Sequence, residues 1–299
     1  MRIVVNTPTG NIGRALVELL LARGAEVTLI ARTPDKVRDL ESRGARVVQG
    51  SIDDAAVVER ALEGASALFW LTPPAARPDW LEWGVGAAKK AAEAARRRDV
   101  KRIVILSSLG AQAGRGTGPV SSLLEIEDAF RAVAPDVIAL RAGFFMENLL
   151  RSVDTIAATG TLFAPFPPDA KAPTVATKDI AAVAAEELVQ RGGGHRIRGV
   201  HGPADLSSAE QAAILSEVLH TPIAYVQVPV EAVEKGMRDA GMPDFAVSMF
   251  GEMYRSILSG KMVSAEPRSP ETTTPTTFAE FARDVVRPAI LASRAAPAS

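Results

Sequence analysis

The sequence predicts a doubly wound α/β sheet of parallel strands, followed by a smaller, mostly helical C-terminal lobe. Over the first 141 residues, short β-branched runs alternate with longer amphipathic stretches rich in Ala and Leu. A glycine-containing turn follows the first of these runs, and the alternation loosens after Arg141. Parallel strands joined by crossover helices produce such an alternation. Because these crossovers are right-handed, ligands bind beyond the carboxyl ends of the strands.

The first lobe is expected to hold six strands separated by helices. The strands are expected at Arg2–Asn6, Glu26–Ala31, Arg46–Gln49, Ala67–Leu71, Arg102–Ser107 and Val137–Arg141. The helices are expected near 11–23, 34–43, 54–63, 79–98 and 121–134. A helix between every two strands favours a parallel sheet throughout.

The second lobe is expected to begin soon after the sixth strand. Helices are predicted near 144–159, 178–190, 207–219, 229–241 and 244–259, and strands at Arg196–Val200 and Ile223–Val228. A Pro-rich stretch at 165–173, a glycine turn at 192–194 and a Thr/Pro-rich loop at 269–277 separate them, and the chain is expected to fray from about Ala292. We expect domains at 1–150 and 151–299, with 172–200 packing back onto the first.

Composition excludes several classes of protein. The 34 Lys and Arg against 35 Asp and Glu give a net charge of -1, so there is no basic surplus for a nucleic-acid backbone. Cysteine is absent, which excludes disulfides, thiolate nucleophiles and Cys-ligated metals. The first apolar run, Ile3–Val5, is too short for a signal peptide, and no run reaches membrane-spanning length. We therefore expect a cytoplasmic protein with no membrane or nucleic-acid partner.

The turn after the first strand has the pattern of a phosphate-binding loop, Thr7-Pro8-Thr9-Gly10-Asn11-Ile12-Gly13. Gly10 would let the backbone approach a pyrophosphate, Gly13 would let the helix pack on the strand, and the helix N-terminus would face the anion. The alternative is an ordinary tight turn. Thr7 replaces the glycine that often opens such loops, so we expect the backbone there to avoid positive φ. The pattern favours a Rossmann-type dinucleotide site.

The end of the second strand indicates which dinucleotide binds. NAD-specific folds place an acid about 20 residues after the glycines. Here Arg32 stands in that region, and no acid appears before Asp35. A guanidinium suits a 2′-phosphate, to which Thr33 and Lys36 would add donors. We predict NADP(H), with the alternative that Arg32 is only a solvated loop residue.

Further short segments stand in a fixed order along the chain. They are Ala31-Arg32-Thr33-Pro34-Asp35-Lys36, Gly50-Ser51-Ile52-Asp53, Leu71-Thr72-Pro73-Pro74, Ile105-Leu106-Ser107-Ser108, Leu140-Arg141-Ala142-Gly143-Phe144-Phe145-Met146-Glu147-Asn148, Asp179-Ile180-Ala181, Gly202-Pro203 and Thr277-Phe278-Ala279-Glu280-Phe281. In these segments and the glycine loop, the sequence resembles the NmrA-like branch of the atypical short-chain dehydrogenase/reductase superfamily. The resemblance covers most of the chain.

This resemblance implies an NADP(H)-binding lobe and a substrate-binding lobe, in proteins that are either reductases or nucleotide-sensing regulators. It also implies a set of cofactor contacts. These are Gly10, Asn11, Ile12 and Gly13 for the pyrophosphate, Arg32 for the 2′-phosphate, Ser51 and Ile52 for adenine, Leu71, Thr72 and Pro73 for the nicotinamide ribose, and Ser107 and Phe144 beside the nicotinamide. Thr7, Thr9, Thr33, Lys36 and Gly143 are expected as further cofactor contacts. Ordinary core packing is the alternative for the phenylalanines.

The usual proton donor of short-chain dehydrogenases is missing. Their Tyr-x-x-x-Lys pair has no counterpart, because Tyr225 is followed by Pro229 and Tyr254 by Leu258. Leu124 stands where NmrA-like reductases often carry a lysine. Ordinary carbonyl reduction would therefore lack its acid.

The remaining catalytic candidates are Ser107, Ser108 and Glu127. The serines would hydrogen-bond a substrate oxygen, unless they cap local backbone. Glu127 would act as an acid if desolvated, unless it pairs on its helix. The three histidines, His195, His201 and His220, are too scattered for a metal site.

Conjugated acceptors such as quinones, enones and iminium ions need the least proton assistance, so they suit this site best. Leu109, Phe145, Met146, Phe163 and Phe166, with Phe144, would give an apolar wall for a ring-bearing substrate. The glycine-rich loop 110–118 resembles a mobile lid, with a plain surface loop as the alternative.

Three functions follow from these observations. The first is an NADPH-dependent reductase of a conjugated or aromatic small molecule, in specialised metabolism. The second is a non-catalytic NADP(H)-sensing regulator, and the third is a non-redox isomerase or dehydratase on the same fold. A homodimer or a protein partner is left open.

Overall fold

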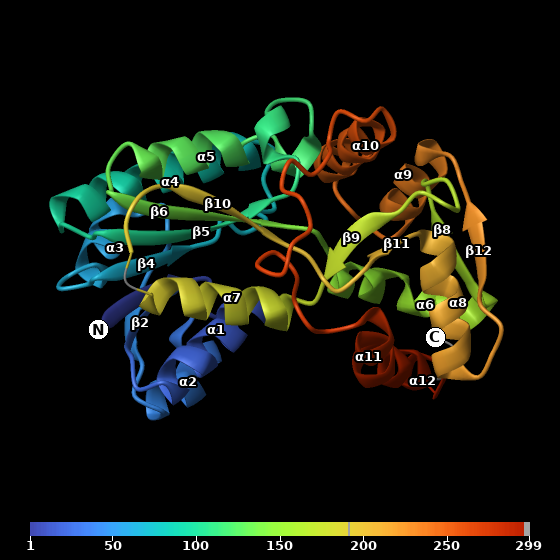
Figure 1. The fold of residues 1–299 in the computed structure, drawn as a ribbon, viewed down its shortest axis with the longest axis horizontal. Coiled ribbons are helices and arrows are strands. Elements are labelled where there is room, and N and C mark those ends of the chain that lie inside the picture. Colours follow the sequence, from blue (N-terminus) through green and yellow to red (C-terminus); the bar gives the residue numbers. More distant parts are fainter. Residues whose placement is uncertain (191, 296–299) are drawn as a thin grey trace.

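In the residues that the computed structural model describes, 1–190 and 192–295, seven parallel strands form the central sheet (Figure 1). Their order is β10-β6-β5-β4-β1-β2-β3. Their bounds are β1 Arg2–Asn6, β2 Glu26–Ala31, β3 Arg46–Gln49, β4 Ala67–Trp70, β5 Arg102–Ser108, β6 Asp136–Ala142 and β10 Arg196–Val200. All six strands expected in the first lobe are present. The order reverses between β1 and β4, which is where doubly wound sheets bind ligands.

Helices cover both faces of this sheet. Ile3 and Val5 of β1 point to one face and Val4 to the other, because side chains alternate along a strand. The first face is covered by α1 Asn11–Ala22, α2 Arg38–Ser42 and α7 Thr177–Val189. The second is covered by α3 Ala55–Ala61, α4 Trp80–Arg97 and α5 Leu123–Arg131. The result is the three-layered Rossmann-type fold that the sequence predicts.

The segment from α7 to β10 lies against the first lobe. Strand β10 pairs with β6, and α7 packs beside α1. Glu187 of α7 is buried and accepts hydrogen bonds from Arg102 of β5 at 3.3 Å and Arg198 of β10 at 2.9 Å. These ion pairs lie at the amino end of β5, away from the ligand edge, so they hold the sheet together.

The second lobe is mostly helical, with two small sheets. Its helices are α6 Val153–Thr159, α8 Ser208–Leu219, α9 Val230–Asp239, α10 Asp244–Leu258, α11 Phe278–Phe281 and α12 Arg287–Ala295, with a π-helical turn at Ala282–Val286. One sheet has the order β11 Asp205–Leu206, β9 Ala172–Val175, β7 Phe144–Phe145, and the other pairs β12 Ala224–Gln227 with β8 Thr161–Ala164. Its own core includes Ile156, Leu215 and Phe281.

Two predictions about this lobe are wrong in part. The helix expected near 144–159 begins instead as strand β7, continues as a 3-10 helix at Met146–Ser152, and becomes α-helical only at α6. Pairing of β7 with β9 outweighs local helix propensity, as it often does for aromatic residues. At the C-terminus, where fraying was expected from about Ala292, α12 extends to Ala295, and 296–299 lie outside the described residues.

A strap formed by residues 261–277 runs back from the second lobe to the first. The His201 N–H donates to the Thr272 carbonyl at 2.8 Å, and the Thr274 N–H donates to the His201 carbonyl at 2.7 Å. The Thr276 N–H donates to the buried carboxylate of Asp179 on α7 at 2.9 Å. This strap, orange to red in Figure 1, joins the two lobes beside the carboxyl edge of the sheet.

Candidate cofactor and substrate site

The glycine loop joins the end of β1 to the start of α1. A Cβ on Gly13 would lie 2.2 Å from the Thr7 carbonyl oxygen, so α1 packs on the loop only with glycine there. A Cβ on Gly10 would make only an ordinary contact of 3.7 Å with the same oxygen. The protein's own packing therefore leaves Gly10 unexplained, whereas a close pyrophosphate would explain it. The first-turn N–H groups of Asn11, Ile12 and Gly13 have no partner within the helix and suit an anion.

Thr7 adopts a φ of 54°, so the expectation that the loop avoids positive φ there is wrong. The proline ring fixes only the φ of Pro8, and the strand-to-helix turn takes its left-handed residue at Thr7 instead. The Thr7 hydroxyl is also buried without a hydrogen-bond partner among the described residues. A phosphate oxygen in this loop would supply that partner, so the loop fits the dinucleotide in both its backbone and its side chains.

Replacing Thr7 by glycine should raise the free energy of unfolding of the cofactor-free protein by about 1 kcal/mol, because glycine adopts positive φ without strain. Urea unfolding measures the effect. Thr33, whose φ is -125°, offers the matched control, since glycine there should lower stability. A stability loss at both positions would contradict strain at Thr7.

Asn6 is a site residue that the sequence interpretation missed. It is fully buried at the end of β1, and its side chain donates to the Leu71 carbonyl at 2.8 Å and accepts from the Leu71 N–H at 2.9 Å. The Pro73 carbonyl accepts from the indole of Trp80 at 3.1 Å. These bonds hold the segment predicted to contact the nicotinamide ribose beside the glycine loop. The signal available in the sequence was that a polar residue, Asn6, follows the apolar run Ile3–Val5 at the end of the strand.

The end of β2 presents positive charge. Arg32 is exposed, and its side chain makes no hydrogen bond or ion pair with any residue that the structure describes. Thr33 and Lys36 are exposed beside it. The nearby Asp35 carboxylate pairs instead with Arg38 at 2.5 Å. An unpaired guanidinium with two further donors is what a 2′-phosphate requires.

The segment after β3 lies close to the loop after β4. Ile52 is buried, and Asp53 accepts a hydrogen bond from the indole of Trp83 at 2.8 Å. Hydrogen bonds from Ser51 and Trp83 lower the pKa of Asp53 below its ordinary value. The guanidinium of Arg77 lies 5.7 Å from the Trp83 ring centroid. The adenine contacts predicted for Ser51 and Ile52 would therefore have Asp53, Arg77 and Trp83 as neighbours, of which the sequence motifs included only Asp53.

Two of the three catalytic candidates are bonded to each other. The Ser107 hydroxyl donates to Glu127 Oε1 at 2.6 Å, and Glu127 is fully buried. Arg131 donates to its Oε2 at 2.8 Å, and Arg141 donates to Oε1 and Oε2 at 3.1 and 2.9 Å. The carboxylate is therefore the shared acceptor of three side chains. Because the Ser107 proton is committed to Glu127, its hydroxyl can only accept from a ligand.

Arg141 carries this polar network further. Its Nη1 donates to Glu266 Oε1 of the strap at 3.0 Å and to Gln112 Oε1 at 3.2 Å. Ser108, by contrast, is partly exposed, and its hydroxyl has no protein partner in the described chain. Ser108 is thus the one candidate of the three whose hydroxyl proton is not already committed.

The glycine-rich loop 110–118 is fastened to α10. The Gly118 N–H donates to Glu252 Oε2 at 3.0 Å, and a Cβ on Gly118 would lie 2.0 Å from the Met249 carbonyl oxygen. The Thr117 hydroxyl donates to the Gly114 carbonyl at 2.7 Å. These contacts favour the surface-loop alternative over a mobile lid.

Three aromatic side chains form a row beside this loop, which we call the aromatic row. The rings of Phe144 and Phe166 lie 6.4 Å apart, and those of Phe166 and Tyr254 lie 5.8 Å apart, both edge-on. All three are partly exposed. Phe144 also packs on the cluster that contains Leu109. The sequence indicated Phe144 and Phe166 but missed Tyr254, because it was judged only against the Tyr-x-x-x-Lys pattern.

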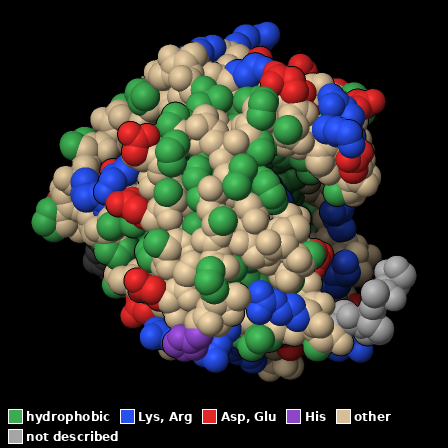
Figure 2. Space-filling view, turned by 90° about the vertical axis from the view of Figure 1, so that its right-hand side faces the viewer, with side chains coloured by type: hydrophobic (Ala, Val, Ile, Leu, Met, Phe, Trp, Pro, Cys, Tyr) green, Lys and Arg blue, Asp and Glu red, His purple; other side chains and the backbone are tan. Residues whose placement is uncertain are grey.

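The other residues predicted to bind substrate are dispersed. Leu109 and Met146 are buried in separate cores, and Phe145 packs on the core of the first lobe. Phe163 of β8 is 42% exposed and is paired with Val226 of β12, which is 41% exposed. Figure 2 shows hydrophobic side chains gathered on this end of the molecule. No ring contact joins Phe163 to the aromatic row within the described ranges.

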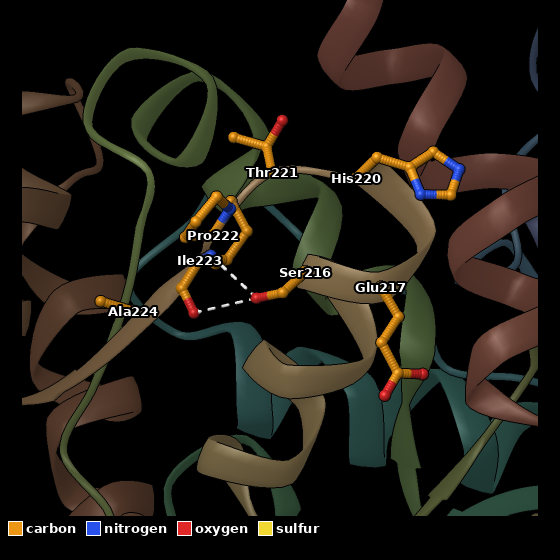
Figure 3. Close-up of a pocket in the computed structure, with 7 residues that line it drawn as sticks. All are labelled: Ser216, Glu217, His220, Thr221, Pro222, Ile223 and Ala224. Carbon is orange, nitrogen blue, oxygen red and sulfur yellow. Dashed lines mark hydrogen bonds between the residues drawn. The ribbon is translucent and has the colours of Figure 1, made fainter.

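The surface of the second lobe also has hollows. One of about 510 Å³ is lined by residues of the turn between α8 and β12: Ser216, Glu217, His220, Thr221, Pro222, Ile223 and Ala224 (Figure 3). The Ser216 hydroxyl is bonded to the backbone of Ile223, accepting from its N–H at 2.8 Å. The Glu217 and His220 side chains point away from each other (Figure 3). This hollow contains none of the predicted site residues, so it adds no chemistry to the site.

Among the described residues, no three His, Cys, Asp or Glu side chains come together in a way that would hold a metal ion. Among the helices at 1–190 and 192–295, none has the length and apolarity needed to cross a membrane.

Comparisons with solved structures support the fold. The Citrobacter sp. triphenylmethane reductase superposes with a TM-score of 0.80 at 20% identity, covering 96% of this chain and 100% of that chain. The NADPH-dependent quinone oxidoreductase of Escherichia coli, complexed with NADPH, superposes with a TM-score of 0.80 at 21% identity, covering 94% of this chain and 98% of that chain.

Comparisons by sequence identify the family. An NAD(P)H azoreductase of Xenophilus azovorans is 30% identical over 290 residues, which cover 94% of this chain and 96% of the relative. The model of the NmrA-like family matches residues 1–282. The resemblance predicted from the ordered motifs is confirmed: the chain belongs to the NmrA-like family.

Proposed function

We propose that this protein is an NADPH-dependent reductase of conjugated or aromatic small molecules, of the quinone, enone or iminium type. The observation that carries the proposal is the carboxyl edge of the sheet. At one end stands the guanidinium of Arg32, which pairs with no described residue, in the middle the glycine loop, and at the other end the partly exposed aromatic row. The named relatives reduce azo compounds, triphenylmethane dyes and quinones, which are all conjugated.

Different residues would bind different parts of NADPH and of the acceptor. The first turn of α1 and Gly10 would hold the pyrophosphate, and Arg32 with Thr33 and Lys36 the 2′-phosphate. Asn6 fixes the backbone of Leu71, on which the nicotinamide ribose would rest. Bound NADPH supplies the hydride. Phe144 and Phe166 would orient an aromatic acceptor beside it and exclude water.

A nucleotide sensor is the second candidate, and one observation favours it. Leu124 occupies the position of the lysine found in related reductases, and both Ser107 and Glu127 are committed to an internal network. A protein that binds NADP(H) without turnover needs a cofactor site but no proton donor. An NADP(H) sensor should discriminate the oxidised from the reduced form, since that difference is its signal.

The experiment follows NADPH absorbance with purified protein and a panel of quinone, enone, azo and iminium acceptors, after cofactor binding is shown by fluorescence. Steady oxidation with at least one acceptor class supports the reductase. Tight binding without turnover, with different affinities for NADP+ and NADPH, supports the sensor. Absence of cofactor binding would overturn both.

A further inference from the structure

The two tyrosines of this chain have different surroundings. The Tyr225 hydroxyl donates to the carbonyl of Ala164 at 3.2 Å and is also bonded to that of Phe166, so it ties β12 to the segment after β8. The Tyr254 hydroxyl makes no hydrogen bond in the part of the chain that the structure describes, and it is not sealed from solvent. Tyr254 therefore places a free phenol at the end of the aromatic row.

Arg151 packs beside the helix that carries this phenol. It comes from the 3-10 helix that follows β7, and its guanidinium lies 5.5 Å from the ring centroid of Phe250, one helical turn before Tyr254 on α10. Arg151 is exposed, and no ion pair or hydrogen bond joins its side chain to another described residue. Burial raises the pKa of Tyr254, and the nearby charge of Arg151 opposes that rise. The phenol is thus protonated at neutral pH.

Within the proposed reductase function, on which this inference rests, we propose that Tyr254 is the proton donor to the acceptor's heteroatom, with Arg151 stabilising the phenolate that remains. A phenol beside a cation is the combination that the Tyr-x-x-x-Lys pair supplies in short-chain dehydrogenases. Here the second lobe provides it, from α10 and the segment after β7. The two residues replace the acid that Leu124 cannot supply.

The step balances for neutral acceptors. Hydride adds to a carbon or nitrogen of the conjugated system, whose electrons move to the terminal oxygen or nitrogen. That atom takes the proton from the Tyr254 hydroxyl, and solvent returns a proton to the phenolate. A cationic acceptor, such as an iminium or a triarylmethyl cation, becomes neutral on receiving hydride and needs no proton. The proposal therefore predicts that neutral acceptors depend on the Tyr254 hydroxyl and that cationic acceptors at the same site do not.

Tyr254→Phe tests it, because the ring and its place in the row are kept while the hydroxyl is lost. Turnover of a neutral quinone or azo acceptor should fall about 100-fold, in the range typical of a lost general acid. Turnover of a triarylmethyl cation and the fluorescence-detected affinity for NADPH should stay within about twofold of wild type. Equal losses for both acceptors, or no loss for either, would overturn the proposal.

Arg151→Met provides an independent arm, with Arg151→Lys as the charge-preserving control. The methionine variant should lose neutral-acceptor turnover by about tenfold, and lysine should restore most of it. In wild type, neutral acceptors should also show a solvent deuterium isotope effect that cationic acceptors lack, which does not depend on how any variant folds. If none of the tested acceptors supports NADPH oxidation by the wild-type protein, the proposed function fails. If the wild-type protein reduces neutral acceptors but shows no solvent deuterium isotope effect with them, only the proposed role of Tyr254 fails.

Discussion

Replacing Glu127 by glutamine should lower the free energy of unfolding by about 3–5 kcal/mol, the largest stability effect that we expect for a single substitution at this site. Glu127 is fully buried and is the shared acceptor of Ser107, Arg131 and Arg141. Glutamine keeps the shape but leaves the Arg141 guanidinium, which is 4% exposed, without its main counter-charge. Urea unfolding followed by circular dichroism measures the change.

The neighbouring Asp128 provides the matched control. It pairs with the same Arg131 at 3.1 Å, but its side chain is 64% exposed. Asp128→Asn should therefore cost no more than about 1 kcal/mol, as surface ion pairs usually do. Similar losses of unfolding free energy in the two variants would mean that the buried network stabilises the protein no more than a surface ion pair does.

Replacing Arg32 by glutamate should weaken NADPH binding by about 100-fold or more while leaving NADH binding within a few fold. The substitution exchanges an unpaired guanidinium for a carboxylate that would repel the 2′-phosphate, which NADH lacks. Fluorescence titration with both nucleotides gives the two dissociation constants. A hundredfold loss corresponds to about 2.7 kcal/mol of binding free energy.

Arg38→Glu controls for the general effect of reversing a charge in this loop. Arg38 is 77% exposed and already pairs with Asp35, so its loss should change NADPH affinity only a few fold. Equal losses of NADPH and NADH affinity in Arg32→Glu would show that Arg32 supports the loop and does not read the phosphate.

Much of the first lobe could be predicted because its signals are local. A β-branched run such as Arg2–Asn6 fits a buried parallel strand, and the glycine spacing fits the turn that follows, so the strand bounds agree within one residue. Strand β7 could not be predicted this way, because it exists only through its pairing with β9. Asn6 shows the same limit, since its importance comes from Leu71, a residue distant in sequence.

The candidate site also has parts that are recognisable from local sequence and parts that depend on distant residues. The glycine loop and Arg32 are recognisable because one short segment carries each of them. Tyr254 comes from α10, and only the fold sets it against Phe166. Likewise, no local pattern showed that Ser107 and Glu127 would be committed to each other, because the bond crosses from β5 to α5.

The ion pair between Arg141 and Glu266 has a consequence for how the protein is made. The two residues are 125 positions apart, and both are largely buried when paired. During synthesis, β6 leaves the ribosome long before the strap that carries Glu266, and folding across such a separation is slow. Glu127 already pairs with Arg141 inside the first lobe, and Glu266 adds a second counter-charge only when the last part of the chain arrives. A chain released before residue 266 should therefore contain the whole glycine loop and still lack the ion pair that ties the strap to β6.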